Sequence, residues 1–340
     1  GSVTHYFGND AVRDHAFDVK DLSGAVVVRN HILRQFERAA WAYDPAYRDA
    51  SATMVVVGGG PTGLETAGAL YELSTHVLQK EFPNSNLQPR VILVEAVDRL
   101  LTPYPSGLQD AAREQLESLG VEVIFSDPVV DASPDQIVLR SGRVIPTRTL
   151  IWSAGVKGSP LANMLGIELI GQNRVPVQPD MTVEALPNVY VVGDMAYVQD
   201  GRGDDYPMQI PVAKQQGILA ARNILRRESG EAPQPFRYSD RGMMATIGRS
   251  RAVAWIYNRI PLTGYFAWIA WLGLHLLWLM GFRNQLNVLV NWAWNYFTYD
   301  RSVRIILEHG QAGSANVRED DREPVEVDAE PADVELEAVL

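Results

Sequence analysis

A short apolar run followed by closely spaced glycines is the feature that most constrains how this sequence folds. Val55–Val57 reads as a buried strand, and the glycines at 58, 60 and 63 fit the pattern GxGxxG ahead of the helix-favouring segment LETAGALYEL. Glycine suits a backbone that turns sharply, approaches a pyrophosphate and lets the helix pack on the strand. The sequence predicts the first turn of a dinucleotide-binding fold, against a merely structural glycine turn. Its candidate cofactor-binding residues are Gly58, Gly60, Pro61, Thr62 and Gly63.

A second apolar strand, Val91–Val94, ends at Glu95. An acid at this place binds the ribose 2′-hydroxyl, and its charge repels a 2′-phosphate, so Glu95 favours NAD(H) over NADP(H). The alternative is an ordinary solvated acid at a strand end. Glu95 lies 32 residues after Gly63 instead of about 20, which weakens its assignment to the ribose unless Thr75–Pro89 is an insertion. Arg99 also lies close enough to blur the preference for NAD(H).

The segments after Glu95 predict the rest of a nucleotide-binding domain. We expect a helix over Ser106–Leu119 and strands over Val121–Phe125 and Arg143–Ile151. The pattern breaks at Ala154 and Gly155, where we expect a cofactor contact and the end of the domain. Upstream, an amphipathic helix is predicted over Ile32–Tyr43.

Another strand-like run, Asn188–Ala196, delivers Gly193 and Asp194 near its end. A carboxylate at the carboxyl end of a sheet strand suits a sugar-alcohol hydroxyl, and glycine lets the backbone approach a flat ring. Such a turn is common on its own, but together with the upstream GxGxxG it points to a flavin. The helix predicted over Pro211–Leu225, with Pro at its first position, would direct the positive end of its dipole there.

Composition excludes several classes of site. The chain has 340 residues, 46% of them hydrophobic, and no cysteine. It is therefore long enough for about two globular domains. It cannot form disulfides, iron–sulfur clusters, thiolate zinc sites or a dithiol redox centre, so a disulfide reductase is excluded, and we expect no metal site.

The net charge of −11 is unevenly distributed. From Val317 to Leu340, ten acidic residues face two arginines, which predicts a solvated, disordered tail. From Arg237 to Leu307, eight arginines face two aspartates. A basic, Trp-rich segment in an acidic protein suggests contact with an anionic lipid surface, and no nucleic-acid partner is expected.

The stretch between Arg259 and Arg283 contains no charged residue and is long enough to span about 30 Å as a helix. Hydropathy alone favours a transmembrane helix. However, His275 lies in its middle, tryptophans are scattered along it, and no second clear span follows. These features favour a helix that lies in the membrane interface.

Seven blocks of the sequence resemble the type II NADH:quinone oxidoreductases, particularly those of actinobacteria. The blocks are GGGPTGLE (58–65), VEAVDRLL (94–101), IWSAGV (151–156), VYVVGDMA (189–196), VAKQQG (212–217), MATIGRSRAVA (244–254) and WLMGFRNQLNVLVNWAWNYFTYDR (278–301). The resemblance covers roughly residues 1–307. It implies an NADH dehydrogenase that contains FAD and does not pump protons, held peripherally on the cytoplasmic face of the cell membrane. The substrate would be a membrane quinone, menaquinone or ubiquinone, and two copies would pair as a homodimer.

The resemblance also implies roles for further residues. Glu65 would lie in the nicotinamide–flavin region, whereas a capping box formed by Thr62 and Glu65 is the purely structural alternative. Gln215 and Gln216 would hydrogen-bond the quinone or flavin carbonyls, against a merely polar helix face. Ala213 matches the family's quinone-site pattern AQxAxQ, whose first Ala and Gln are replaced here by Ile210 and Pro211.

The predicted fold is therefore α/β, a double dinucleotide-binding, Rossmann-like flavoprotein fold with a C-terminal amphipathic or apolar helical membrane anchor. Family members begin with a further GxGxxG unit for FAD that this sequence does not show, so we expect an N-terminally truncated fold. The expected parts are a remnant of the FAD-binding domain (1–50), an NADH-binding domain (51–155), the C-terminal part of the FAD-binding domain (156–236), a membrane-anchoring and quinone-access region (237–307) and an acidic disordered tail (308–340). The alternative is a catalytically inactive NAD(H)-binding module at the membrane surface.

Overall fold

A four-stranded parallel sheet lies at the centre of the part of the chain that is predicted to bind a nucleotide. This computed structural model describes residues 1–81 and 87–298. The sheet order is β4–β3–β2–β8, from β4 (Glu122–Ile124), β3 (Arg90–Val94), β2 (Thr53–Val57) and β8 (Thr149–Trp152). The predicted strands at Val55–Val57, Val91–Val94 and Val121–Phe125 are confirmed here, and all neighbours pair in parallel, as in a dinucleotide-binding fold.

The single strand predicted over Arg143–Ile151 is wrong. Its two halves, β7 (Val144–Pro146) and β8, belong to different sheets. Between them the Thr147 hydroxyl donates to the carbonyl of Thr53 at 2.6 Å and accepts from the N–H of Thr149 at 3.1 Å. These bonds redirect the chain into the parallel sheet.

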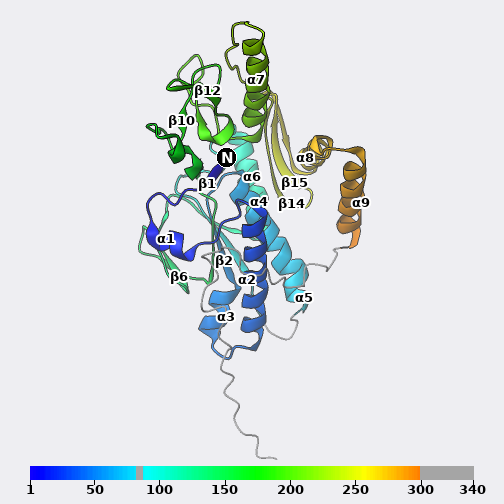
Figure 1. Cartoon of the computed structure of the whole chain (residues 1–340). Coiled ribbons are helices and arrows are strands. Elements are labelled where there is room, and N and C mark those ends of the chain that lie inside the picture. Colours follow the sequence, from blue (N-terminus) through cyan, green and yellow to red (C-terminus); the bar gives the residue numbers. More distant parts are fainter. Residues whose placement is uncertain (82–86, 299–340) are drawn as a thin grey trace, which may run out of the picture.

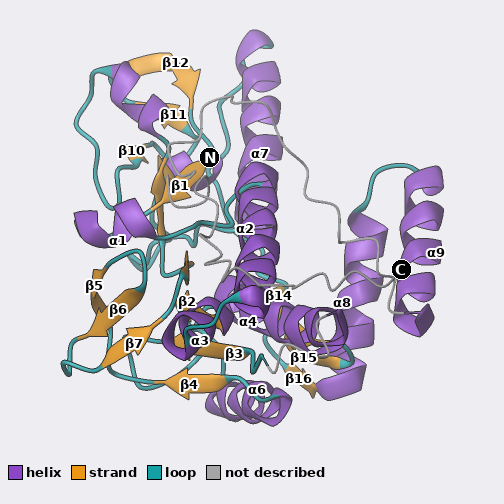
Figure 2. Cartoon of the chain, turned by 90° about the horizontal axis from the view of Figure 1, so that it is seen from below, coloured by secondary structure: helices purple, strands orange, loops and turns teal. Residues whose placement is uncertain are grey.

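Alternate residues of the parallel strands face two different layers, as the two-residue period of a strand requires. Met54 and Val56 pack towards helices α2 (Leu22–Trp41), α4 (Pro61–Leu73) and α6 (Ser106–Leu119). Val55 and Val57 pack on the other face, against an antiparallel sheet of β5 (Val129–Ala132), β6 (Gln136–Leu139) and β7. Both sheets can be followed in Figure 2.

The first long helix is longer than the predicted helix over Ile32–Tyr43. Helix α2 begins at Leu22, because the Asp21 side chain caps it by accepting from the N–H of Gly24 at 2.7 Å. Its predicted apolar face is confirmed, since Ile32 and Phe36 are fully buried in the core.

The long spacing between the glycine turn and Glu95 has a structural cause. After α4 the helical path continues through a π-helical turn (Ser74–Leu78) into α5 (Gln79–Glu81) before the chain enters β3. The helix Ser106–Leu119 is confirmed as α6, and its left-handed C-cap is Gly120.

The remaining short elements come from the two segments that flank the parallel sheet in sequence. They are β1 (Ser2–Thr4), α1 (Asp10–His15), α3 (Pro45–Ala52), β9 (Val156–Gly158), a 3₁₀ turn (Pro160–Leu165), β10 (Val175–Pro176), β11 (Thr182–Val183), β12 (Leu186–Tyr190), a 3₁₀ turn (Gly193–Met195) and β13 (Ala196–Tyr197). They pair as β1–β9, β10–β13 and β11–β12. The strand predicted over Asn188–Ala196 is confirmed only over Asn188–Tyr190, because β12 ends at Tyr190 and a 3₁₀ turn follows at Gly193–Met195.

The helix predicted over Pro211–Leu225 is confirmed as α7 (Ile210–Glu228). It begins one residue earlier than expected, so Pro211 is its second residue. The helix dipole therefore starts at Gln209 and Ile210.

An antiparallel sheet within the predicted membrane-anchoring region was missed from the sequence. It consists of β14 (Gly242–Gly248), β15 (Arg251–Ile256) and β16 (Ile260–Thr263), in that order. Helix α4 packs on β14 so closely that a Cβ on Gly68 would lie 1.6 Å from the carbonyl oxygen of Ile247. The sheet thus shares its hydrophobic core with α4.

The uncharged stretch between Arg259 and Arg283 forms strand β16 and one helix, and a second helix begins at its end. Helices α8 (Gly264–Trp278) and α9 (Phe282–Thr298) lie at the side of the molecule, beyond β14 and β15 (Figure 1). The chain turns between them, where Gly281 has a φ of +84°. Over residues 1–81 and 87–298, no helix combines the length and the hydropathy that crossing a membrane requires. The end of the predicted anchor (299–307) and the predicted tail (308–340) lie outside the described residues.

Candidate functional site

The glycine turn between β2 and α4 has the geometry that a bound dinucleotide requires. Gly58 adopts a φ of +114°, and a Cβ there would lie 2.8 Å from the Cα of Ala154. A Cβ on Gly63 would lie 1.7 Å from the carbonyl oxygen of Gly58. Gly60 caps α4 without any side-chain hydrogen bond, so the first N–H groups of this helix are open to an anion.

The alternative of a capping box at Thr62 and Glu65 is wrong. Helix α4 begins at Pro61, so both residues already lie inside it, and its N-cap is Gly60. Glu65 accepts a hydrogen bond from the N–H of Thr246 on β14 at 3.2 Å instead.

Glu95 lies directly beside the glycine turn. Its Oε2 accepts from the N–H of Gly59 at 2.5 Å, and its Oε1 accepts from the N–H of Val97 at 3.0 Å. The carboxylate is thereby fixed where the strand β3 ends next to the turn of β2. This is the place at which an acid binds a ribose hydroxyl.

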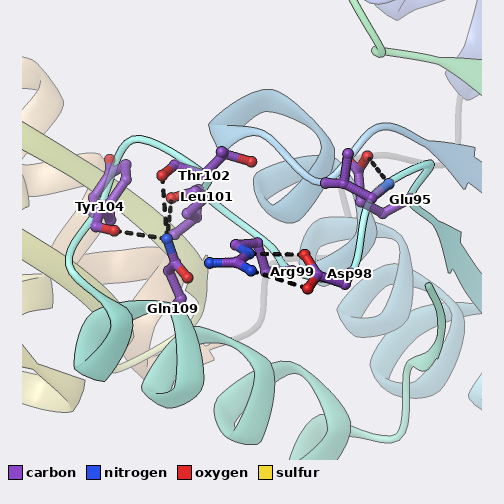
Figure 3. Close-up of polar contacts among 8 residues, drawn as sticks. Glu95, Asp98, Arg99, Leu101, Thr102, Tyr104 and Gln109 are labelled. Atoms are coloured by element: carbon purple, nitrogen blue, oxygen red, sulfur yellow. Dashed lines mark hydrogen bonds and ion pairs between the residues drawn. The ribbon is translucent and has the colours of Figure 1, made fainter. Parts of the chain in front are cut away.

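A loop from Leu101 to Tyr104 covers the turn and is held by one side chain that the sequence analysis missed. The N–H of Leu101 donates to the carbonyl of Gly59 at 2.8 Å. From α6, the buried Gln109 amide donates to the carbonyls of Tyr104 at 2.7 Å, Thr102 at 3.1 Å and Leu101 at 3.4 Å (Figure 3). Gln109 therefore fixes the loop that adjoins the nucleotide site.

Ala154 and Gly155 lie between the glycine turn and the N-terminal segment. The backbone of Ala154 lies directly against Gly58, since a Cβ added at Gly58 would be 2.8 Å from the N and Cα atoms of Ala154. Gly155 accepts from the N–H of His5 at 3.0 Å, and a Cβ there would lie 2.9 Å from the ring of Phe7. This pair thus joins the two parts of the chain at which the two cofactors are expected.

Gly193 and Asp194 form a 3₁₀ turn at the N-terminal end of α7. Gly193 has a φ of +73°, and a Cβ there would lie 3.2 Å from the Cβ of Ala213. Asp194 accepts from the hydroxyl of Ser2 at 2.5 Å and lies 3.9 Å from the ammonium of Lys20. No side chain among the described residues caps α7, which leaves the positive end of its dipole at this turn.

The two glutamines of α7 bind the backbone in this structure. Gln216 is buried, and its Oε1 accepts from the N–H of Gly193 at 2.7 Å. Gln215 exchanges two hydrogen bonds with the backbone of Ser239, at 2.9 and 3.1 Å. Gln216 thus shapes the Gly193 turn, and Gln215 ties α7 to the segment that leads into β14.

Glu65 lies where α4, β14 and α8 converge. Partial burial raises the pKa of its carboxyl, and the hydrogen bond from Thr246 and the proximity of His275 lower it by less. Burial, together with the charge of Glu65, also raises the pKa of Tyr104, whose buried hydroxyl has no hydrogen-bond partner within the described residues. His275 donates from Nδ1 to the carbonyl of Trp271 at 2.8 Å and stacks on its ring.

The predicted residues therefore gather in four places rather than one. Gly58, Gly60, Pro61, Thr62, Gly63, Glu95, Ala154 and Gly155 surround the turn after β2; Gly193, Asp194, Ala213 and Gln216 surround the turn before α7; Glu65 lies between α4 and β14; and Gln215 lies beside Ser239. Within the described part of the chain, no group of three or more His, Cys, Asp or Glu side chains could hold a metal ion. Ser2, Tyr104 and Gln109 were not singled out from the sequence. Only a weak indication in the sequence pointed to a structural role for Gln109, namely its place as a polar residue on the apolar face of a predicted helix.

Comparisons with known proteins identify the family of this chain. Residues 13–217 match the model of the pyridine nucleotide-disulphide oxidoreductase family. The type II NADH:quinone oxidoreductase Ndh of Mycobacterium tuberculosis is 35% identical over 321 residues, which cover 91% of this chain and 68% of that protein. The corresponding NdhA is 37% identical, with coverages of 86% and 64%. This chain thus spans about two thirds of the length of these curated relatives.

A solved structure shares the fold. The structure of NDH2 from Plasmodium falciparum in complex with NADH superposes with a TM-score of 0.80 at 16% identity, covering 91% of this chain and 78% of that one. This fold agrees with the family model, which matches more than half of the sequence, and with the two M. tuberculosis relatives. The chain belongs to the pyridine nucleotide-disulphide oxidoreductase family and, within it, to the type II NADH:quinone oxidoreductases, whose cofactors are FAD and NADH.

Proposed function

We propose that this chain takes part in the flavin-dependent oxidation of NADH and passes the electrons to a membrane quinone without pumping protons. The observation that carries the proposal is the Glu95 carboxylate, bonded to the N–H of Gly59 beside the open N-terminus of α4. The names of the M. tuberculosis relatives support both the donor and the acceptor. FAD, when bound, accepts the hydride of NADH and supplies two electrons to the quinone.

The residues of this chain divide between the two nucleotides. The turn from Gly58 to Gly63 and the N-terminus of α4 would bind the pyrophosphate of NADH, and Glu95 its adenosine ribose. Asp194, with its hydrogen bond from Ser2 and its place at the N-terminus of α7, would bind a flavin hydroxyl. Gly193 leaves room for a flat ring because it carries no side chain.

Glu65 is the residue that we assign to the transfer of a proton. Its raised pKa favours the protonated carboxyl, and the Thr246 N–H fixes its orientation. Reduction of a quinone consumes two protons, so a carboxyl that is neutral closer to physiological pH suits the region between the nucleotide and α8. Gln215 would act on the quinone only after releasing Ser239.

We also propose that α8 and α9 attach the protein to the surface of a lipid bilayer, on the cytoplasmic face of the cell membrane. Large apolar side chains are exposed along both helices and the connection between them, at Phe266, Ile269, Leu277, Trp278, Met280, Phe282, Leu286, Leu289, Val290 and Trp294. A surface of this kind is stable in the interface between headgroups and acyl chains. Pairing of two copies through this region stays a prediction.

Binding to vesicles tests the attachment. Phe282→Asp should weaken co-sedimentation with vesicles that contain phosphatidylglycerol, because it places a charge on an apolar side chain that is 79% exposed. Trp41→Asp is the matched control, since Trp41 is 80% exposed at the end of α2, far along the chain from α8 and α9. Equal binding by both variants would contradict the attachment.

The division of the chain into parts is likewise our proposal. Residues 51–155 would bind NADH, residues 1–50 and 156–236 would belong to the flavin-binding part, and residues 237–307 would approach the membrane and the quinone. The bond between Asp194 and Ser2 supports the second assignment, because it joins both segments of that part. An actinobacterial affiliation is supported by 35–37% identity with the M. tuberculosis proteins, compared with 29% for a Staphylococcus aureus enzyme.

The visible absorbance spectrum tests the redox function. We expect a flavin band in the purified chain that bleaches when NADH is added without oxygen and returns when a soluble menaquinone analogue is added. A chain that shows no flavin band, and gains none with added FAD, would refute the redox function for this chain. It would then act as a nucleotide-binding module only.

A further inference from the structure

Arg99 lies in the loop that begins at Glu95, four residues after the candidate ribose ligand. An arginine near such an acid is the residue type that accommodates the 2′-phosphate of NADP(H). The sequence alone therefore leaves two opposing groups in one loop: Glu95, which rejects a 2′-phosphate, and Arg99, which attracts it.

The carboxylate of Asp98 forms an ion pair with the guanidinium of Arg99. Nε of Arg99 donates to Oδ1 of Asp98 at 2.8 Å, and Nη2 donates to Oδ2 at 2.9 Å, so the pair is bidentate (Figure 3). This fork geometry is the one with which arginine also binds phosphate. The two acceptors therefore compete for the same donors.

The pair is held near the nucleotide site although both side chains are exposed. The loop that carries it is fixed at one end by the bond from Val97 to Glu95 and at the other by the bond from Leu101 to Gly59. The hydrogen bonds from Arg99 lower the pKa of the Asp98 carboxyl, so the carboxylate stays charged at neutral pH. Asp98 thus also adds a second negative charge to the loop that begins at Glu95.

We propose that Asp98 is a specificity-determining residue, which engages Arg99 and so prevents it from binding the 2′-phosphate of NADPH. This inference rests on the proposed NADH site at the glycine turn. Glu95 rejects the phosphate directly, and Asp98 removes the cation that would otherwise compensate. Selection against NADPH then depends on two acids instead of one.

The test compares Asp98→Ala with the double variant Asp98→Ala/Arg99→Ala in the full chain. Dissociation constants are measured for NADH and NADPH, and for ADP-ribose and its 2′-phosphate, which require no flavin chemistry. Asp98→Ala should lower the ratio of the NADPH to the NADH dissociation constant about tenfold, because a freed guanidinium forms a charge-assisted bond with the phosphate. The double variant should restore most of the original ratio, and the gain in Asp98→Ala should shrink as salt is added.

Three results separate the alternatives. A ratio that does not change in Asp98→Ala, or that falls equally in the double variant, would overturn the role of Asp98 in engaging Arg99. Asp98→Asn, which keeps a hydrogen-bond acceptor but removes the charge, should give a smaller shift than Asp98→Ala; a larger one would also overturn it. Wild-type protein that binds neither NADH nor ADP-ribose would refute the proposed nucleotide site itself, and this inference with it.

Discussion

Replacing Gln109 by leucine should loosen the loop over the glycine turn. The buried amide of Gln109 has two hydrogens, and its two shorter bonds reach the carbonyls of Tyr104 at 2.7 Å and Thr102 at 3.1 Å. Leucine has a similar size but donates nothing. Each net hydrogen bond is worth about 1 kcal/mol, and stranding a carbonyl acceptor adds to that. We expect the free energy of unfolding, measured by urea titration of tryptophan fluorescence, to fall by about 2–3 kcal/mol.

The same substitution should weaken nucleotide binding. Leu101, in the loosened loop, donates to the carbonyl of Gly59 in the glycine turn, so its displacement disturbs the pyrophosphate site. We expect the NADH dissociation constant of Gln109→Leu to rise about tenfold, a loss of about 1.4 kcal/mol. Titration of NADH at constant protein concentration measures this.

A second glutamine on α6 provides the control. The amide of Gln115 donates to the carbonyls of Ala111 at 3.0 Å and Ala252 at 3.4 Å, away from the loop. Gln115→Leu should cost about 1 kcal/mol of stability and leave NADH binding unaltered. Our reasoning is refuted if Gln109→Leu is as stable as the wild type, or if both variants weaken NADH binding equally.

Three further substitutions test other parts of the structure. Gly68→Ala should destabilise the protein by about 1–3 kcal/mol, because the new Cβ would lie 1.6 Å from the carbonyl oxygen of Ile247. The control is Gly107→Ala on α6, whose Cβ would meet no atom within 4 Å. In the same urea titration this variant should be as stable as the wild type or slightly more stable. Because the pKa of Glu65 is raised in the folded protein, the contribution of Glu65 to stability is complete below pH 4.5 and is lost as the pH rises through the folded-state pKa. The free energy of unfolding of Glu65→Gln should therefore rise relative to that of the wild type between these two pH values. If the two proteins lose stability in parallel with pH, this prediction is contradicted. Glu95→Gln should raise the NADH dissociation constant about tenfold, since a charge-assisted bond to the ribose is lost, and an unchanged constant by titration would remove Glu95 from the site.

Local patterns predicted the nucleotide-binding part of the fold well. Strand β2, the glycine turn and helix α4 follow one another in sequence, so apolar runs and glycine spacing define them without knowledge of distant contacts. The strand that ends at Glu95 was recognised for the same reason. Even its unusual distance from Gly63 has a local cause, the helical extension through Ser74–Leu78.

Contacts between distant segments could not be predicted in this way. Ser2 and Asp194 are 192 residues apart, and Thr246 and Glu65 are 181 apart, yet each pair forms a hydrogen bond. No periodicity in one sequence encodes such pairs. The β14–β16 sheet was missed because its strands lie in a segment whose tryptophans and arginines suggested a membrane surface.

Helix α4 brings these separate parts together. Its N-terminus is open beside the glycine turn, its middle presents Glu65 to Thr246, and near its end Glu72 accepts from the N–H of Arg249 at 2.5 Å. One rigid element therefore contacts both the candidate pyrophosphate site and the sheet on which α8 packs. Gly68 lets α4 and β14 approach at backbone distance, so the Thr246 N–H of the sheet reaches the Glu65 carboxylate. The orientation of Glu65, to which we assign the proton transfer, thus depends on the contact between α4 and the same sheet on which α8 packs.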